Sequence, residues 1–252
     1  MSIDTVQVRR ELRRRVNLGI RDFEGWYRAQ KGDHYVQSEE AAVLDVLDIR
    51  PDSTVIDAGC GGGRFSLLLA PRARWVRAVD FSPVAVRATL DRARLQGLAN
   101  VCGEVADLTE GLLGEPADRI VSVQTLQHIP TFAERLQAAC TLRDALRPGG
   151  RLVATVFNGD RWLDRLRGRR RESIDPEQSW YYSYRFTATD LTFLLELAGL
   201  AQVRVEGLIN LPGRLYRWPL AGSLRPADRF LGRSRLGTAL GIYLLATGVR
   251  PE

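Results

Sequence analysis

The chain has 252 residues, of which 45% are hydrophobic and 26% are charged, and this composition is typical of a globular protein. No apolar run reaches the ~18–20 residues that a membrane-spanning helix needs, so we expect no membrane span. The N-terminus lacks the apolar segment of a secretory signal. The three cysteines form neither a CxxC pair nor a cluster with histidine. We therefore expect a reducing, cytoplasmic location and no bound metal.

Basic residues outnumber acidic residues by 36 to 30, and two arginine tracts account for the excess. Residues 9–15 and 161–171 together carry a net charge of +9 in a chain whose net charge is +6, so the remaining residues carry −3. Tracts of this kind are usually solvated surfaces. The alternative is contact with an anionic substrate or an anionic surface.

The first elements are predicted to be helices. Apolar residues recur at steps of three and four between Val8 and Tyr27, which predicts an amphipathic helix over residues 4–30. Ser38 is then expected to begin a second helix that ends at Leu47, because serine favours the position before a first helical turn. The apolar face of the first helix could cover the rest of the chain or form a dimer contact.

From residue 51 onward, short apolar strands alternate with helices, which is the pattern of a parallel sheet with helices on both faces. The expected strands lie at residues 54–57, 75–79, 101–106, 119–123, 151–157, 202–208 and 241–249. Two stretches, 158–186 and 209–240, interrupt the alternation and are expected to be irregular. We interpret residues 1–37 as an N-terminal helical lid and residues 38–252 as the main domain.

The segment VIDAGCGGGRF at residues 55–65 carries the strongest functional signal. A strand ends in an acid, and a glycine-rich turn then leads into a helix. Glycines let a ligand approach the backbone closely, and ligands of open parallel sheets bind at the carboxyl ends of the strands. The dinucleotide fingerprint GxGxxG fails in both registers, because Arg64 and Ser66 stand where the third glycine is required. Asp57 before the turn suits a ligand with an ammonium group better than a pyrophosphate.

This turn resembles the first motif, (D/E)xGxGxG, of class I S-adenosyl-L-methionine-dependent methyltransferases. Further segments that resemble this family follow in order: VRAVD at 76–80, ADL at 106–108, DRIVSVQTLQHIP at 118–130, LRPGGRLV at 146–153 and the stretch 184–200. The resemblance covers about residues 38–208 and the last strand. It implies a Rossmann-like, doubly wound α/β sheet of seven strands with the last strand antiparallel, an N-terminal helical lid and two inserted cap segments.

The resemblance implies S-adenosyl-L-methionine as the cofactor and S-adenosyl-L-homocysteine as its product. Asp80, which ends the second strand, would accept hydrogen bonds from both ribose hydroxyls, and Phe81 would pack on the adenine. Asp107 would bind the adenine amino group, with Glu104 as the alternative, and Gln124 would lie at the methionine end. The expected cofactor residues are Asp57, Gly59, Gly61, Asp80, Phe81, Asp107, Leu108 and Gln124.

Candidates for catalysis and acceptor binding are fewer. The two histidines are His128, which is either a structural residue or a general base near the methyl donor, and His34 in the lid, which is a second candidate base. Aromatic side chains either pack the lid or form the wall of an acceptor pocket. The expected pocket residues are Tyr35, Trp180, Tyr181 and Tyr184.

The resemblance favours methyl transfer to an oxygen, nitrogen or carbon nucleophile of a small-molecule acceptor, by a monomer or a homodimer. Nucleic acid is not favoured as a partner, because no RNA-binding module is appended. The arginine tracts motivate one alternative, methylation of an anionic macromolecule, a lipid or a carrier-bound substrate. A second alternative is a protein that binds S-adenosyl-L-methionine without transferring its methyl group.

Overall fold

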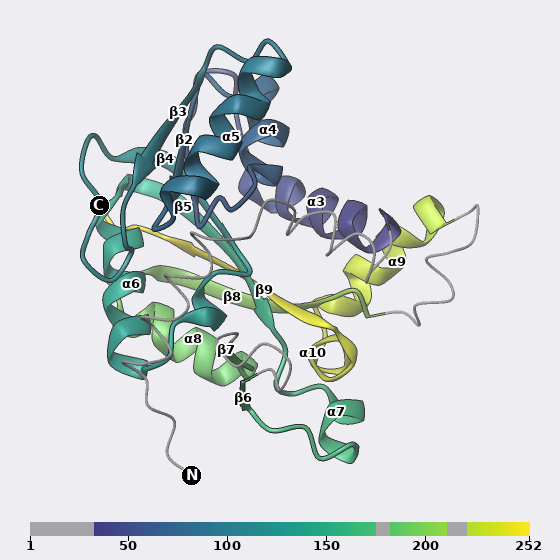
Figure 1. Cartoon of the computed structure of the whole chain (residues 1–252). Helices are drawn as coiled ribbons and strands as arrows, with labels where there is room; N and C mark the ends of the chain where they lie inside the picture. The colour runs from purple at the N-terminus through teal and green to yellow at the C-terminus, as the bar shows by residue number, and fades with distance from the viewer. Residues whose placement is uncertain (1–32, 175–181, 211–220) are drawn as a thin grey trace.

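The computed structural model describes residues 33–174, 182–210 and 221–252 (Figure 1). The predicted helix over residues 4–30 and the arginine tract within it lie outside the described residues, as do Trp180 and Tyr181. None of the helices in the described ranges is both long enough and apolar enough to cross a bilayer.

A seven-stranded sheet forms the centre of the molecule, in the order β3-β2-β1-β4-β5-β9-β8. The first five strands run parallel to one another, whereas β9 is antiparallel to both of its neighbours. Its members are β1 (Thr54–Ala58), β2 (Trp75–Asp80), β3 (Val101–Val105), β4 (Ala117–Val123), β5 (Leu146–Phe157), β8 (Ala201–Leu208) and β9 (Tyr243–Val249). This arrangement confirms the predicted doubly wound sheet with an antiparallel last strand.

Helices cover both faces of the sheet, because successive strand residues point to opposite faces. On one face, Val55 and Val121 pack with residues of α3 and α4, and α5 packs on β2 and β3. On the other face, Ile56 and Ile120 pack with residues of α6 and α8. These helices are α3 (Asp33–Leu47), α4 (Arg64–Leu69), α5 (Pro83–Leu95), α6 (Phe132–Asp144) and α8 (Ala188–Leu197).

The second helix starts earlier than the sequence predicted. It begins at Asp33 instead of Ser38, and Val36 in this added part is completely buried. The expected boundary between a lid and a main domain at residue 37 therefore falls inside α3. His34 and Tyr35 belong to the first turn of this helix.

The described parts of the two expected cap segments contain helices and strands, which corrects the prediction that these segments are irregular. The segment after β5 contains α7 (Trp162–Leu166) and an antiparallel pair of strands, β6 (Glu172–Ile174) and β7 (Tyr182–Tyr184). The segment between β8 and β9 contains α9 (Ala221–Gly232) and α10 (Arg235–Leu240).

The backbones of α9 and α10 pack closely against β8, although α9 contains Pro226. A Cβ atom at Gly207 of β8 would overlap with the carbonyl of Gly237 in α10, and one at Gly232 would overlap with the carbonyl of Gly207. These three glycines let α9 and α10 lie directly against the strand. The side-chain amide of Asn158, just after β5, donates hydrogen bonds to the carbonyls of Thr238 at 2.6 Å and Gly241 at 2.8 Å.

Candidate cofactor site

The glycine-rich turn after β1 is closed on one side and open on the other. Gly59 and Gly63 have φ angles of 83° and 85°. A Cβ atom at Gly59 would overlap with the side chain of Thr125, and one at Gly63 would lie 2.8 Å from Thr89. Gly61 has a φ of 51°, yet a Cβ atom there would meet nothing within 4 Å. The backbone at Gly61 therefore leaves room for a ligand to approach.

Asp57 is buried beneath this turn and is 2% exposed. Its Oδ2 accepts a hydrogen bond of 2.6 Å from Ser66 Oγ. Burial raises the pKa of Asp57 to about 6, although the hydrogen bonds from Ser66 and the charge of Arg64 oppose the shift. The carboxyl group can therefore change its protonation state in the weakly acidic range, which is unusual for aspartate.

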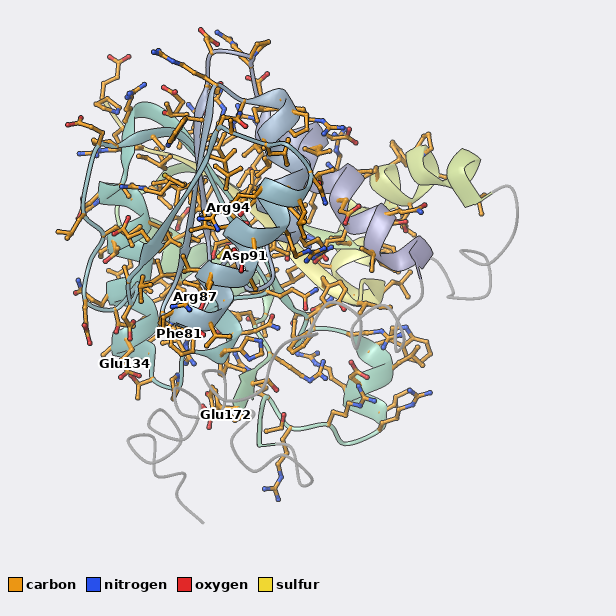
Figure 2. The ribbon with its side chains drawn as sticks, turned by 45° about the horizontal axis from the view of Figure 1, so that its top comes forward. Phe81, Arg87, Asp91, Arg94, Glu134 and Glu172 are labelled. Carbon is orange, nitrogen blue, oxygen red and sulfur yellow. The ribbon has the colours of Figure 1, made fainter. Side chains whose placement is uncertain are left out.

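Asp80 ends β2 on the other side of the turn and connects two backbone segments. Its Oδ2 accepts the Gly61 amide at 3.0 Å, and its Oδ1 accepts the Ser82 amide at 2.9 Å. Burial raises the pKa of Asp80, and the two amide hydrogen bonds oppose that shift. The carboxylate thus fixes the glycine-rich turn against the start of α5. Phe81, the next residue, lies at the N-terminal end of α5 (Figure 2).

The segment after β3 lies beside Asp80, because the Ala106 amide donates to the Asp80 carbonyl at 3.1 Å. Asp107 Oδ1 accepts hydrogen bonds from the amide and hydroxyl of Thr109, at 2.9 and 2.7 Å, so it closes a turn. The alternative residue, Glu104, forms an ion pair with Arg77 at 3.4 Å. Of the two carboxylates, only Asp107 comes after the end of β3, in the segment that lies beside Asp80. Asp107 therefore stays our prediction for the adenine contact.

The predicted Leu108 is part of the main core rather than a surface residue. Its side chain is 7% exposed and packs with the residues of α6 and α8. Any contribution of Leu108 to a cofactor therefore comes from its backbone or from the shape of the surface that it supports.

Sequence reasoning missed Glu39, a completely buried carboxylate on α3. Its Oε1 accepts hydrogen bonds from Gln124 Nε2 at 2.9 Å and Thr155 Oγ1 at 3.0 Å. Its Oε2 forms an ion pair of 2.6 Å with Arg64 Nη2. Gln124 itself has a left-handed backbone, with a φ of 54°. Glu39 therefore joins α3 to the ends of β4 and β5 and to the first residue of α4.

The ring of His128, in the short 3-10 turn Leu126–His128, is held by protein groups on both nitrogens. Nδ1 lies 2.9 Å from the Tyr182 carbonyl, which can only accept, so Nδ1 carries the proton. The side chain of Gln127 accepts the Phe157 amide through Oε1 at 2.7 Å, so its Nε2 donates to His128 Nε2 at 3.3 Å. Burial lowers the pKa of His128. This geometry favours the structural alternative for His128.

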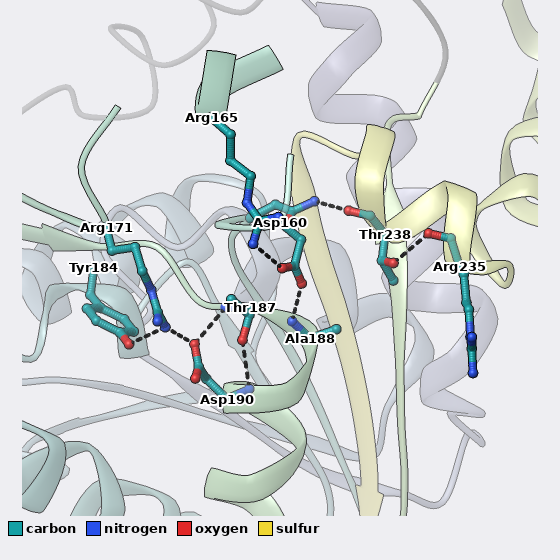
Figure 3. Close-up of polar contacts among 10 residues, drawn as sticks. Asp160, Arg165, Arg171, Tyr184, Thr187, Ala188, Asp190, Arg235 and Thr238 are labelled. Carbon is teal, nitrogen blue, oxygen red and sulfur yellow. Dashed lines mark hydrogen bonds and ion pairs between the residues drawn. The ribbon is translucent and has the colours of Figure 1, made fainter. Parts of the chain in front are cut away.

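Tyr184, the one expected pocket residue with a described side chain, makes protein contacts. The guanidinium of Arg135 lies 4.0 Å from the centre of its ring, and the ring meets Phe186 edge-on at 4.8 Å. Its hydroxyl accepts a hydrogen bond of 2.6 Å from Arg171 (Figure 3). These contacts favour packing of the cap segment over an acceptor wall.

The described residues contain no group of His, Cys, Asp or Glu arranged to hold a metal.

Comparisons with known proteins identify the family. The sequence model of a family described as a methyltransferase domain matches residues 49–193. The chain is also 37% identical over 249 residues to a ubiquinone biosynthesis O-methyltransferase of Xylella fastidiosa strain 9a5c, with 90% of this chain and 87% of the relative covered. The chain belongs to the class I S-adenosyl-L-methionine-dependent methyltransferases.

Other methyltransferases resemble the chain less closely. Nodulation protein S of Rhizobium tropici is 31% identical over 115 residues, which cover 44% of this chain and 48% of that protein. The structure of the N-methyltransferase NodS from Bradyrhizobium japonicum WM9 with S-adenosyl-L-homocysteine has a TM-score of 0.62 at 17% identity, with 99% of this chain and 100% of that chain covered. A possible histamine N-methyltransferase from Thermotoga maritima has a TM-score of 0.64 at 18% identity, with 96% and 99% covered. At such identities these structures show a shared fold.

The turn of this methyltransferase fits S-adenosyl-L-methionine, the family's cofactor. Gly61 exposes backbone to open space, while Gly59 and Gly63 leave no room for side chains on the protein side. The acids on both sides, Asp57 and Asp80, are fixed by hydrogen bonds at the carboxyl ends of neighbouring strands. The site therefore combines two acidic side chains with a backbone that a ligand can approach closely. These features suit a ligand that carries positive charge and hydroxyl groups.

Proposed function

We propose that this methyltransferase transfers a methyl group to a hydroxyl oxygen of a small-molecule acceptor. The observation that carries the proposal is the 37% identity to an O-methyltransferase across 90% of this chain. That similarity covers more of the chain than the methyltransferase domain at residues 49–193, which contains the first cap segment, and extends into the second cap segment. Since acceptor specificity depends on such additions to a common fold, similarity across them supports a similar type of acceptor.

The residues of the site would bind and orient the cofactor. Asp80 would accept hydrogen bonds from the ribose hydroxyls, and Phe81 and Asp107 would contact the adenine. The ionised form of Asp57 and the neighbourhood of Gln124 would favour the ammonium end. When bound, S-adenosyl-L-methionine supplies a methyl group that is already activated on a sulfonium. The main task of the chain is then to align an acceptor oxygen with that methyl group.

An acceptor hydroxyl also has to lose its proton. By sequence His128 is the first candidate to receive it, although its hydrogen bonds favour a structural role. Its lowered pKa keeps the imidazole neutral at neutral pH, with the proton on Nδ1. The lone pair of Nε2 accepts from Gln127, so this amide must leave before an acceptor can use the same nitrogen. His34, in the first turn of α3, is the second candidate.

The arginine tract 161–171 gives limited support to methylation of an anionic macromolecule. Several of its arginines make ion pairs: Arg165 pairs with Asp160 of the same cap segment at 3.6 Å, and Arg171 pairs with Asp190 of α8 (Figure 3). Buried Asp164 also pairs with Arg161 at 3.6 Å and Arg169 at 3.4 Å. These pairs order the segment, and a structural role already explains much of the tract.

Paired acceptors test the proposal. The purified protein would receive methyl-labelled S-adenosyl-L-methionine with a substituted catechol or with the matching aromatic amine, and mass spectrometry would locate the label. We expect O-methylated catechol and S-adenosyl-L-homocysteine in equal amounts. Methylation of the amine alone would contradict oxygen transfer. Tight cofactor binding without methylation of either acceptor or of any cell fraction would support the non-catalytic alternative.

A further inference from the structure

Three helices of the cap segments lie in succession along one side of the molecule (Figure 1). α7 follows the end of β5, and α9 follows the end of β8. α10 contacts both α7 and α9. Because β5 and β8 run in the same direction as β1, all three helices leave the sheet at the edge where the cofactor turn lies. We call the outer surface of α7, α9 and α10 the cap face.

Each of these three helices carries large apolar side chains that are exposed to solvent. Phe230 on α9 is 81% exposed and Leu236 at the start of α10 is 59% exposed. On α7, Trp162 and Leu166 are 46% and 74% exposed. These two residues are four positions apart, so they share one side of the helix. Several exposed apolar residues on adjacent helices indicate a binding surface, whereas single ones do not.

The same helices and their connections also carry exposed arginines. Among the described side chains, these exposed arginines are Arg165, Arg167, Arg169, Arg170, Arg171, Arg233 and Arg235. Most acidic groups nearby are directed inward: Asp164 and Asp228 are each 4% exposed. Glu206 pairs with Arg229 and, at 3.6 Å, with Arg233. The charge that faces solvent is therefore predominantly positive, with the exposed Glu172 as an acidic neighbour (Figure 2).

We propose that the cap face docks on an anionic lipid surface. Arginines attract acidic headgroups, and aromatic and aliphatic side chains enter the boundary between headgroups and acyl chains. RNA would also be attracted by the positive charge, but binding to its phosphates would not require exposed leucines on the same helices. The inference rests on the proposed function in one respect: docking at this edge of the sheet would bring the acceptor site to a membrane-dissolved small molecule.

Vesicle co-sedimentation of the full-length protein tests docking without reference to catalysis. We expect binding to phosphatidylcholine vesicles that contain about 30% phosphatidylglycerol, and much weaker binding to pure phosphatidylcholine. Raising salt from about 0.1 M to about 0.5 M should weaken the binding, because headgroup attraction is screened. Equal binding to both vesicle types, no binding to either, or preferential binding to RNA over anionic vesicles would overturn the proposal.

Two pairs of variants separate the cap face from general surface effects. We expect the double variant Phe230→Ser/Leu236→Ser to lose at least ~tenfold in vesicle binding, and Arg233→Glu/Arg235→Glu to lose a similar amount. The controls Leu95→Ser and Arg94→Glu change exposed residues of α5 (Figure 2). This helix packs on β2 and β3, at the side of the sheet that is farthest from β8. Equal losses in the controls would contradict docking through the cap face.

The docking proposal and the proposed function can fail separately. All four variants should bind S-adenosyl-L-homocysteine as the natural chain does, which also shows that they are folded. They should methylate a water-soluble acceptor at the normal rate. Normal methylation without vesicle binding would overturn docking alone, and vesicle binding without O-methylation would overturn the acceptor proposal alone.

Discussion

The buried carboxylate of Glu39 forms an ion pair of 2.6 Å with Arg64, the residue directly after the glycine-rich turn. The same carboxylate accepts hydrogen bonds from Gln124, which directly follows β4, and from Thr155, which lies in β5. One side chain of α3 thus connects three elements that border the cofactor turn. Through Glu39, α3 is therefore tied to the elements that border the glycine-rich turn.

Replacing Glu39 should be costly for stability and for cofactor binding. We expect Glu39→Ala to lower the free energy of unfolding by about 3–5 kcal/mol, because it leaves a partly buried guanidinium without its main counter-charge. Urea unfolding measures this loss, and calorimetry measures the affinity for S-adenosyl-L-homocysteine. Glu40→Ala is the control, because its 3.6 Å pair with Arg64 is longer and more exposed, and it should cost about 0–1 kcal/mol. Equal effects of both substitutions would contradict the role assigned to Glu39.

Two glycines of the turn should respond differently to alanine. Gly59→Ala should destabilise the fold by at least ~3 kcal/mol, because its methyl group would overlap with Thr125 in a left-handed backbone. Gly61→Ala has space for its methyl group, so it should cost only about 1–2 kcal/mol of backbone strain. It should nevertheless weaken S-adenosyl-L-homocysteine binding by at least ~tenfold, because the methyl group enters the open side of the turn. Thermal unfolding and calorimetry together distinguish these effects. Unchanged binding by a folded Gly61→Ala variant would show that the ligand lies elsewhere.

Asp57 should give the stability of the protein a characteristic pH dependence. Its folded-state pKa of about 6 exceeds the ordinary value of 3.8, so the folded state binds this proton more tightly than the unfolded state. The resulting stabilisation is complete below about pH 4 and is lost as the pH rises through 6. Asp57→Asn removes this dependence, so relative to the natural chain it should gain about 2–3 kcal/mol between pH 4 and 7. Urea titrations of both proteins at several pH values measure the difference, and parallel curves would contradict the raised pKa.

The pH dependence of cofactor affinity is a second test of the protonation of Asp57. If the ionised Asp57 favours the ammonium end of the ligand, binding of S-adenosyl-L-homocysteine should strengthen as the pH rises through 6. The Asn variant should show a flatter profile. A natural chain with constant affinity between pH 5 and 8 would remove Asp57 from the binding role.

His128 should behave mainly as a structural residue. We expect His128→Asn to retain activity within ~tenfold, because the amide can still donate to the Tyr182 carbonyl. His128→Ala loses that bond and should lower stability by about 1–3 kcal/mol. Methylation rates at saturating cofactor, together with unfolding curves, distinguish a catalytic role of His128 from a structural one. A loss beyond ~100-fold in both variants with normal cofactor affinity would instead identify His128 as the general base.

Much of the fold could be predicted because its signals are local in sequence. Short apolar strands that alternate with helices indicated the parallel sheet, and the turn at 55–65 indicated the ligand site at the ends of its strands. The structure confirms this sheet and brings Asp57, Gly61 and Asp80 together at that edge.

Other features depend on contacts between distant residues and gave no local signal. Glu39 meets Gln124 and Thr155 across 85 and 116 residues of chain, so its position in sequence looked like an ordinary helix start. The prolines of residues 209–240 suggested irregular structure, whereas close contacts among glycines of β8, α9 and α10 permit packed helices there. Sequence spacing contains no information on such approaches between elements.

Small-molecule methylation is tested most directly by incubating the protein with methyl-labelled S-adenosyl-L-methionine and a fractionated extract of its source cells. We expect label in the small-molecule fraction, including lipid-soluble small molecules, carried on an oxygen of a single product. The Gly61→Ala variant, which should bind the cofactor weakly, is the matched control and should leave that product unlabelled. Label confined to RNA or protein would contradict the proposed function.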